Sequence, residues 1–344
     1  MLIVYILLFI FALSGCKFAG KGFKAEESLS RNVTDSIKGI FIWLVFLSHF
    51  ASYVTYTSGI DIWGKWISAQ LGQLIVVAFL FYSGYGVCEA IKKRGSEYVK
   101  PFPKKRILKT LLHFDMAVLM FLIIQLCSGK TYTVSNIILS FIGWESFGNS
   151  NWYIFDVLVL YAITWISFML IRKNNKIALL LATILSVIFI YFLMRTRWSW
   201  WYDTVLCYVA GMWFSIYKDQ FLKIVTRNNF IWLVAAVFSL GSFYILHEGS
   251  FGLKGLILMP LSFCLAMVLI LIKFPISNRL LALSGQYTFE LYILQRIPMI
   301  ILENLGLADF NHYVYFIACF GITIGLAFVF RLLTNKVDEL IFKK

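Results

Sequence analysis

Long runs of apolar residues, separated by short polar segments, extend along nearly the whole chain. Each run is close to the roughly 20 residues that an α-helix needs to cross the hydrocarbon core of a bilayer. The pattern predicts membrane-spanning helices at 2–18, 36–56, 70–91, 108–127, 151–171, 177–194, 201–217, 230–246, 255–272, 283–303 and 313–333. We therefore expect an all-α fold, a polytopic transmembrane helical bundle with a ten-helix core and one extra N-terminal helix.

Composition excludes several other classes of protein. Of the 344 residues, 60% are hydrophobic and only 14% are charged, against roughly 25% charged residues in soluble domains. Such a chain is neither disordered nor collagen-like, and it is not an ordinary soluble enzyme. The six cysteines stand singly within apolar segments, so we predict neither a disulfide framework nor a metal site.

Positive charge is distributed unevenly between the two sides of the predicted bundle. Of the 31 Lys and Arg residues, 25 fall in alternate connections, beginning with segment 17–38, and six fall elsewhere. Cytoplasmic loops of membrane proteins carry this excess of cations, which predicts a cytoplasmic C-terminus. A nucleic-acid-binding surface would need one continuous basic patch, so the net charge of +14 does not indicate nucleic acid.

The first predicted helix allows two interpretations. The segment 13–16, Leu-Ser-Gly-Cys, resembles a bacterial lipoprotein cleavage site, which would make Cys16 a lipidated N-terminus. Residues 1–12, however, contain no charged side chain and therefore lack the basic start of a signal peptide. We favour an uncleaved helix. We expect residues 1–30, this helix and a basic linker, to precede a transmembrane domain at 31–344.

Ionisable side chains within predicted spans are the first candidates for function, because placing them in a bilayer costs free energy. Asp35, Lys38 and His49 share one helical face, since Lys38 and His49 are eleven residues apart, or three turns plus about 20°. His49 would lie about 16 Å deeper in the membrane than Lys38. The alternative is a lysine that extends to the interface and a histidine that hydrogen-bonds to a neighbouring helix.

Two further spans carry polar groups of this kind. Arg106, Lys109 and His113 follow at positions i, i+3 and i+7 of one helix and therefore share a face. For Arg106 and Lys109, the alternative is that they belong to the ordinary excess of cations in cytoplasmic segments. The predicted span at 283–303 carries Glu290, Tyr292 and Gln295. A segment this polar is expected to line a cavity.

Aromatic residues mix with charge in two segments expected on the outer side. One segment contains Trp152, and the other contains Trp201 and Asp203. Such residues suit an acceptor site in which a sugar ring stacks on an aromatic side chain. An interfacial aromatic belt explains them equally well, so the sequence leaves both interpretations open.

These motifs resemble those of the acyltransferase-3 family of bacterial integral membrane proteins. The first core helix of that family carries an acid, then an Arg and, after ten intervening residues, a His, which Asp35, Lys38 and His49 match with Lys in place of Arg. A later helix of the family begins with Arg-x-x-Arg, which Arg106 and Lys109 resemble.

Two further motifs extend the resemblance to about residues 30–335. The family has an apolar run that ends in Ser-Gly-aromatic, matched by Ser83 and the two residues after it. Near its end it has a Ser…Tyr-Leu-x-His pattern, which the segment from Ser284 to Tyr292 resembles, with Gln295 in place of His. Glutamine cannot transfer protons, so only a hydrogen-bonding role is expected at that position.

The resemblance implies an enzyme that moves an acyl group, commonly acetyl, from a cytoplasmic donor to a surface polysaccharide. The expected co-substrate is acetyl-CoA or another acyl-CoA, with no permanently bound cofactor and no nucleic-acid partner. The acceptor would be a cell-envelope or capsular glycan, free or lipid-linked, and the enzyme would lie in the bacterial cytoplasmic membrane. Cations at the cytoplasmic mouth, with a histidine deeper in the membrane, suit such a donor.

The resemblance also assigns roles to the candidate residues. His49 would be catalytic, either as a base toward an acceptor hydroxyl or as a transient carrier of the acyl group. Lys38, Arg106 and Lys109 would bind the donor. The supporting cavity residues would be Asp35, His113, Glu290, Tyr292 and Gln295, and the acceptor-side residues would be Trp152, Trp201 and Asp203.

Two other functions remain open on sequence grounds. A proton-coupled transporter also buries polar groups on facing helices, and His49, Asp115 and Glu290 would then form its relay. Carriers often contain inverted repeats and broken helices, whereas this chain has five prolines and no evident repeat. A lipid-linked glycan polymerase or flippase has a similar composition. Consumption of a thioester would distinguish the acyltransferase from both.

Overall fold

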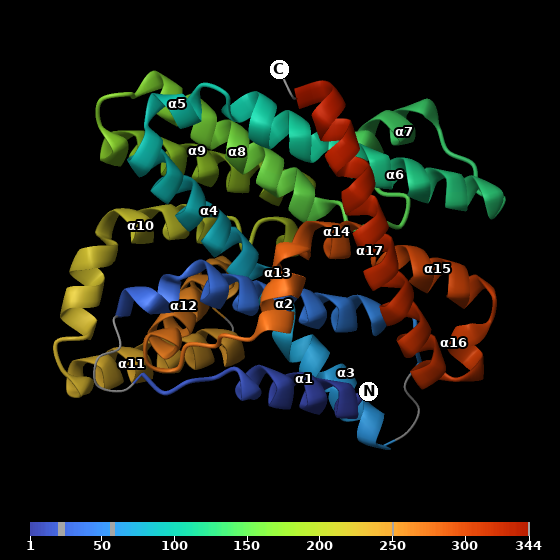
Figure 1. The fold of residues 1–344 in the computed structure, drawn as a ribbon, viewed down its shortest axis with the longest axis horizontal. Coiled ribbons are helices and arrows are strands. Elements are labelled where there is room, and N and C mark those ends of the chain that lie inside the picture. Colours follow the sequence, from blue (N-terminus) through green and yellow to red (C-terminus); the bar gives the residue numbers. More distant parts are fainter. Residues whose placement is uncertain (20–24, 56–58, 250, 343–344) are drawn as a thin grey trace.

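The computed structural model describes residues 1–19, 25–55, 59–249 and 251–342. This part of the chain is helical throughout and contains no β-strand beyond a single antiparallel bridge between Cys16 and Ile276. The all-α prediction is therefore confirmed (Figure 1). Lys21 and Lys24, which contribute to the predicted charge asymmetry, lie outside the described residues.

Seventeen α-helices follow one another along the described part of the chain. In order they are α1 (Leu2–Ser14), α2 (Arg31–Phe50), α3 (Gly59–Leu71), α4 (Leu74–Arg94), α5 (Ser96–Val99), α6 (Lys109–Cys127), α7 (Val134–Phe141), α8 (Trp152–Leu170), α9 (Asn175–Thr196), α10 (Leu206–Val225), α11 (Asn229–Glu248), α12 (Gly252–Lys273), α13 (Arg279–Gln286), α14 (Thr288–Leu294), α15 (Arg296–Asn304), α16 (Leu307–Phe310) and α17 (His312–Phe342). Shorter turns of other helix types occupy Ala25–Leu29, Pro103–Leu108 and Ser199–Trp201.

Eight helical segments of the described chain are long and apolar enough to cross a membrane. They are Arg31–Phe50, Asp61–Arg94, Pro103–Cys127, Trp152–Leu170, Asn175–Thr196, Asn229–Glu248, Gly252–Lys273 and His312–Phe342. Each coincides with one of the eleven predicted spans. The apolar faces of α9 and α11 remain exposed in the folded chain, as expected of helices that contact lipid. The protein is therefore a polytopic membrane protein.

The other three predicted spans take different forms. α1 has 13 residues, fewer than the roughly 20 that a perpendicular crossing needs. α10 begins at Leu206 and continues into the polar residues after Lys218. The segment predicted at 283–303 is divided into α13, α14 and α15. Pro298 contributes to the second division, because it lacks the N–H that would bond to the carbonyl of Leu294.

Helix α2, which carries the predicted motif, crosses α13 at very short range. Gly39 lies against the backbone carbonyl of Leu281, and Gly285 lies against the backbone carbonyl of Asp35, so that a Cβ at either glycine would overlap the facing oxygen. Small residues allow this approach between membrane helices. The crossing fixes Asp35 and the neighbouring Lys38 against the broken segment α13–α14.

Helices α4 and α10 form a second crossing of the same kind. Gly84 lies against the carbonyl of Tyr208, and Gly211 lies against the carbonyl of Phe81. Neither position has room for a Cβ. We call these two contacts, α2–α13 and α4–α10, the glycine crossings. The second one fixes Ser83 of α4, which belongs to the predicted Ser-Gly-aromatic motif.

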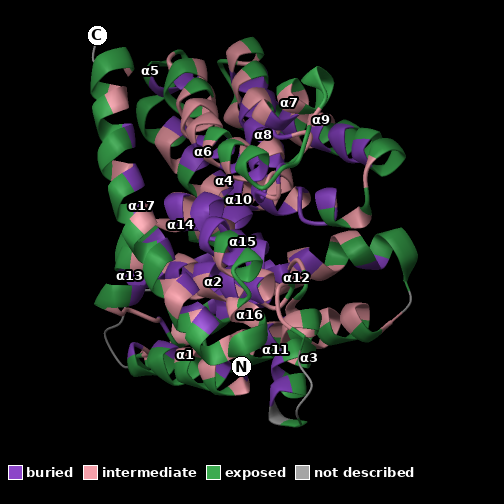
Figure 2. Cartoon of the chain, turned by 90° about the vertical axis from the view of Figure 1, so that its right-hand side faces the viewer, coloured by how far each residue is buried: buried purple, intermediate pink, exposed green. Residues whose placement is uncertain are grey.

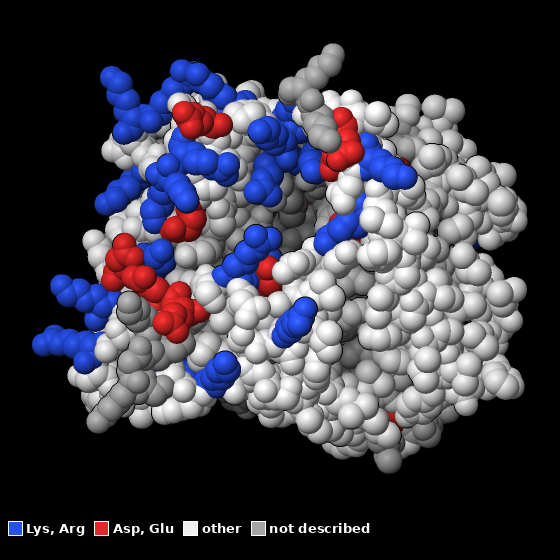
Figure 3. Space-filling model, viewed as in Figure 1, with Lys and Arg blue, Asp and Glu red and all other residues white. Residues whose placement is uncertain are grey.

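Burial and charge separate the regions of the molecule. Buried residues concentrate in the centre, on α2, α4, α10 and α14, whereas α1 and α17 present mostly exposed residues (Figure 2). Lys and Arg side chains gather on one half of the face seen in Figure 3, and the other half is almost free of charge. The charged half agrees with the cytoplasmic side expected from the sequence.

Sidedness can be measured by cysteine labelling. With the native cysteines removed, a Ser96→Cys variant is expected to react with an impermeant thiol reagent only from the cytoplasmic side, because Ser96 lies exposed in the cation-rich segment. Lys130→Cys, at an exposed position after α6 that the sequence predicts on the outer side, serves as the matched control. Strong labelling of Ser96→Cys from outside intact cells would reverse the whole topology.

Candidate active site

A hollow lies at the charged half of the molecule, among α2, α4, α6, α8, α14 and α17 (Figure 3). It consists of two adjoining cavities of about 450 and 640 Å³. Residues that line both are Lys38, Tyr82, Ser83, Arg106, Tyr161 and Arg331. We call the two together the basic cavity. The volume of each of the two lies in the range of small-molecule and cofactor sites.

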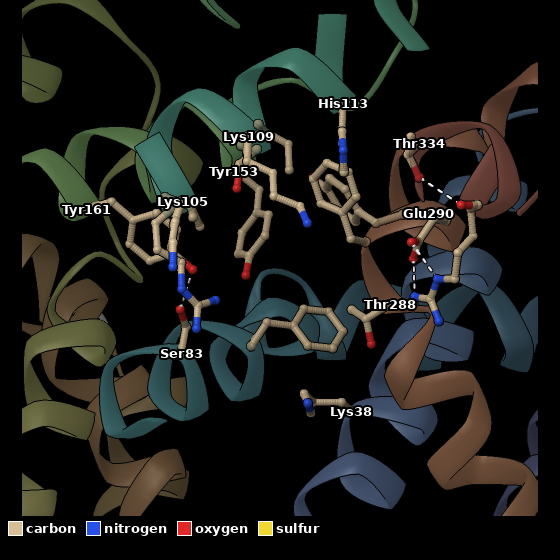
Figure 4. Close-up of a pocket in the computed structure, with 18 of the residues that line it drawn as sticks. Lys38, Ser83, Lys105, Lys109, His113, Tyr153, Tyr161, Thr288, Glu290 and Thr334 are labelled. Atoms are coloured by element: carbon tan, nitrogen blue, oxygen red, sulfur yellow. Dashed lines mark hydrogen bonds and ion pairs between the residues drawn. The ribbon is translucent and has the colours of Figure 1, made fainter. Parts of the chain in front are cut away.

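All three predicted donor-binding cations line this cavity. Lys38 enters from α2 and Lys109 from α6 (Figure 4). Arg106 enters from the turn before α6. His113 follows on the same face of α6 and also lines it. The helical spacing in the sequence therefore predicted which side chains converge, although α2 and α6 are about 70 residues apart along the chain.

Carboxylates neutralise most of these cations. Lys38 Nζ lies 2.5 Å from Asp35 Oδ1, and Arg31 Nε lies 3.5 Å from Asp35 Oδ2. Lys109 Nζ lies 2.6 Å from Asp338 Oδ2. Asp35, predicted as a supporting residue, therefore positions Lys38 from the preceding turn of its own helix.

Arg331 makes the most extensively supported ion pair of the cavity. Its Nε donates to Glu290 Oε1 at 2.8 Å and its Nη2 donates to Glu290 Oε2 at 2.6 Å. The guanidinium also lies 3.5 Å from the centre of the Tyr287 ring and hydrogen-bonds to the carbonyl of Gln286. Bidentate pairing of this kind fixes both partners. Glu290, predicted as a cavity residue, thus connects α14 to α17.

Arg106 differs from the paired cations. Its guanidinium lies 6.0 Å from the centre of the Tyr98 ring, and no carboxylate of the described chain lies within ion-pair distance of it. The side chain is exposed at the rim of the cavity. An arginine that no carboxylate neutralises is suited to bind a phosphate group through its planar fork of donors.

The inner end of the cavity is formed by aromatic hydroxyls. Tyr153 of α8 and Tyr292 of α14 line it, with ring centres 5.2 Å apart. Ser83 Oγ lies 3.1 Å from the hydroxyl of Tyr161. These groups give the deep part of the cavity hydrogen-bonding capacity without charge.

His49 lies behind this tyrosine pair. Its ring centre is 6.2 Å from that of Tyr292, and it does not line the basic cavity itself. Its Nδ1 is buried, and no described residue hydrogen-bonds to it. The carboxylates of Asp115, Asp156 and Glu290 do not reach this nitrogen, and Glu290 instead binds Arg331.

The surroundings of His49 beyond the tyrosines are polar. Arg296, at the start of α15, interacts electrostatically with His49 and donates from Nε to the hydroxyl of Tyr53 at 2.9 Å. Gln295 is buried and donates to the carbonyl of Tyr292 at 3.1 Å, while its Oε1 has no partner among the described residues. Gln295 therefore supports the geometry of the α14–α15 break.

The predicted acceptor-side residues occupy different environments. Trp201 is buried, with its ring centre 5.6 Å from that of Trp144, so it belongs to the packed interior. Asp203 is also buried, whereas Trp152 is half-buried against Tyr153. The structure therefore does not present these three side chains as one exposed stacking surface.

Among the cavity residues that the sequence analysis did not single out are two charged ones on α17, Arg331 and Asp338. Arg331 counted only as a topology signal there, and Asp338 lies beyond the last predicted span. A signal was present, because seven residues separate them, which is two turns less about 20° and places them on one helical face.

No group of His, Cys, Asp and Glu within the described ranges is arranged to hold a metal ion. The basic cavity and its surroundings offer histidines, cations and hydroxyls for chemistry. A cationic mouth that narrows to a neutral tyrosine-lined end suits a ligand with phosphates at one end and an uncharged reactive group at the other.

Comparison with protein families matches residues 33–332 to a model of the acyltransferase-3 family, described as an acyltransferase domain. Comparisons with curated proteins and with solved structures gave no match. The family match covers nearly the whole chain and includes both motif helices, α2 and α6. It also favours acyl transfer over the transporter and the glycan polymerase or flippase. The chain therefore belongs to the acyltransferase-3 family and is a membrane acyltransferase.

Proposed function

We propose that this acyltransferase moves an acetyl group from cytoplasmic acetyl-CoA to a hydroxyl of a cell-envelope glycan, free or lipid-linked, in the bacterial cytoplasmic membrane. The observation that carries the proposal is the basic cavity and its continuation toward His49. Lys38, Arg106 and Lys109 are suited to the phosphates of CoA. The neutral end between Tyr153 and Tyr292 suits the pantetheine arm and thioester.

The position of His49 supports a role at the thioester end of the donor. It lies on the same face of α2 as Lys38, three turns further along, which corresponds to an axial distance of about 16 Å. The acyl group would thus reach the membrane interior while the charged head of CoA stays at the mouth. This arrangement avoids moving a polyanion across the bilayer, which would be very costly.

The proposed reaction is acyl transfer with His49 as the base. A neutral ring nitrogen accepts the proton of the acceptor hydroxyl, the hydroxyl oxygen bonds to the thioester carbonyl carbon, and the carbon–sulfur bond breaks. The proton then passes from His49 to the leaving thiolate, which gives the ester and free CoA. Tyr292, whose ring centre lies 6.2 Å from that of His49, would hydrogen-bond to the carbonyl oxygen as negative charge develops on it.

The test uses purified protein in lipid vesicles with acetyl-CoA and envelope glycan. We expect ester formation on the glycan and release of free CoA in equal amounts, measured by mass spectrometry and by a thiol reagent. Vesicles without glycan are the control for simple thioester hydrolysis. The glycan is taken from a strain that lacks the gene for this protein. If this glycan gains no ester while the thioester of acetyl-CoA stays intact, acyl-CoA is not the donor.

A further inference from the structure

One carboxylate of the basic cavity contacts a lysine and a histidine at once. Asp338 Oδ2 lies 2.6 Å from Lys109 Nζ, and Asp338 Oδ1 lies 2.9 Å from His113 Nε2. The Asp338 side chain is only 14% exposed and lines the cavity beside both partners. A negative group therefore occupies the place on α6 where the proposed function puts a phosphate of the donor.

Asp338 reaches this place because α17 is unusually long. The helix has 31 residues, or about 46 Å, whereas the hydrocarbon core is about 30 Å thick. Asp338 lies near its C-terminal end, with Thr334 and Asn335 also lining the cavity. The family match ends at residue 332, so this contact is made by the part of α17 beyond the matched domain.

The pair formed by Asp338 is exchangeable, unlike the pair formed by Glu290. Arg331 is held by Glu290, by the Tyr287 ring and by a backbone carbonyl together. Lys109, in contrast, is 42% exposed, and Asp338 is its one carboxylate partner among the described residues. Pairs with an exposed partner contribute little to stability, so a competing anion can replace Asp338 at Lys109.

We propose that Asp338 is an internal competitor for the phosphates of the donor, a proposal that rests on acyl-CoA being the donor. Asp338 pairs with Lys109 and contacts the His113 ring when the cavity holds no donor, and it releases both when a phosphate binds. A phosphate monoester carries a charge of about −1.5 to −2 and three acceptor oxygens, so it displaces the single carboxylate. The exchange lowers donor affinity and speeds release of CoA after transfer.

The test is binding of coenzyme A to the purified full-length protein, combined with steady-state kinetics. Asp338→Asn keeps the shape of the side chain and removes its charge. We expect the Kd for CoA and the KM for acetyl-CoA to fall together by about three- to tenfold, the effect of one charge contact in a partly exposed site. Asp338→Glu, which keeps the charge, is expected to stay within about twofold of wild type.

A matched control separates local competition from a general change of charge. Glu97→Gln removes one negative charge from an exposed position on the same half of the molecule, outside the cavity, and is expected to leave the Kd unchanged. The double variant Lys109→Ala with Asp338→Asn tests the mechanism directly. If Asp338 acts by occupying Lys109, the Asp338 substitution has little further effect once Lys109 is absent.

Three outcomes would overturn the proposal. Weaker CoA binding in Asp338→Asn would mean that Asp338 positions the cations for the donor. An unchanged Kd would mean that it does not compete. Failure of the wild-type protein to bind CoA would overturn both this proposal and the proposed function, whereas wild-type binding without tightening in Asp338→Asn would overturn this proposal alone.

Discussion

A His49→Gln variant is expected to transfer the acyl group about 10²- to 10⁴-fold more slowly than the wild-type protein. Glutamine retains hydrogen-bonding capacity but cannot accept and return a proton. The effect should appear in kcat, because His49 does not line the basic cavity and contributes no contact to the head of the donor. The measurement is the rate of ester formation at saturating acetyl-CoA, normalised to the amount of protein in the membrane.

His247 provides a matched control for this substitution. It lies in α11, its Nε2 is 2.8 Å from Gln70 Oε1, and it is not part of the basic cavity. His247→Gln is expected to keep wild-type activity. If His49→Gln acylates the glycan at more than about a tenth of the wild-type rate, below the effect of losing a general base, His49 is only a structural residue and the proposed mechanism is wrong.

Removal of Arg106 is expected to weaken use of the donor by about 10- to 100-fold. A charge-assisted hydrogen bond to phosphate contributes about 1.5–3 kcal/mol, and Arg106 is exposed at the cavity rim with no carboxylate partner among the described residues. The loss should appear in the KM for acetyl-CoA and in the Kd for CoA. Lys38→Arg is expected to retain activity, because an arginine fork also binds phosphate.

Arg94 offers a control that shares one contact with Arg106. Its guanidinium lies 4.4 Å from the centre of the same Tyr98 ring, but it does not line the basic cavity. Arg94→Ala removes an equal charge from the same side of the molecule and should leave the KM unchanged. If the KM for acetyl-CoA is unchanged in both Arg106→Ala and Lys38→Ala, these cations do not bind the donor. They would then serve only to orient the chain in the membrane.

The sequence predicted the convergence of the donor-site cations well, for physical reasons. Charge asymmetry places Lys38 and Lys109 on the same side of the membrane, and helical spacing places His113 on the face of Lys109. The elements that carry them are long apolar helices, which are the easiest to recognise. Few helix faces can meet at the same depth in the membrane. Charge asymmetry and helical spacing together were therefore enough to predict that these residues line one cavity.

Features that depend on polar or broken helices were harder to predict. The apolar run ends near residue 333, but α17 continues to Phe342 because residues 334–342 contain neither Gly nor Pro. That continuation brings Asp338 to the cavity. Likewise, the segment at 283–303 reads as one span, although Pro298 already indicates an interruption. The surroundings of His49 depend on tertiary packing, which spacing within one helix does not specify.

The glycine crossings divide the cavity wall into a stiff half and a compliant half. Backbone touches backbone at Gly39, Gly84, Gly211 and Gly285, so α2 and α4 have no side-chain layer that could be compressed or rearranged between them and their partners. On the opposite wall, α6 and α17 meet through the Lys109–Asp338 pair, whose long side chains adapt to a change in separation. Under the proposed function, a bulky donor would be accommodated by displacement of α6 and the C-terminal end of α17, and Lys38 and Ser83 would form the fixed wall against which its thioester is aligned.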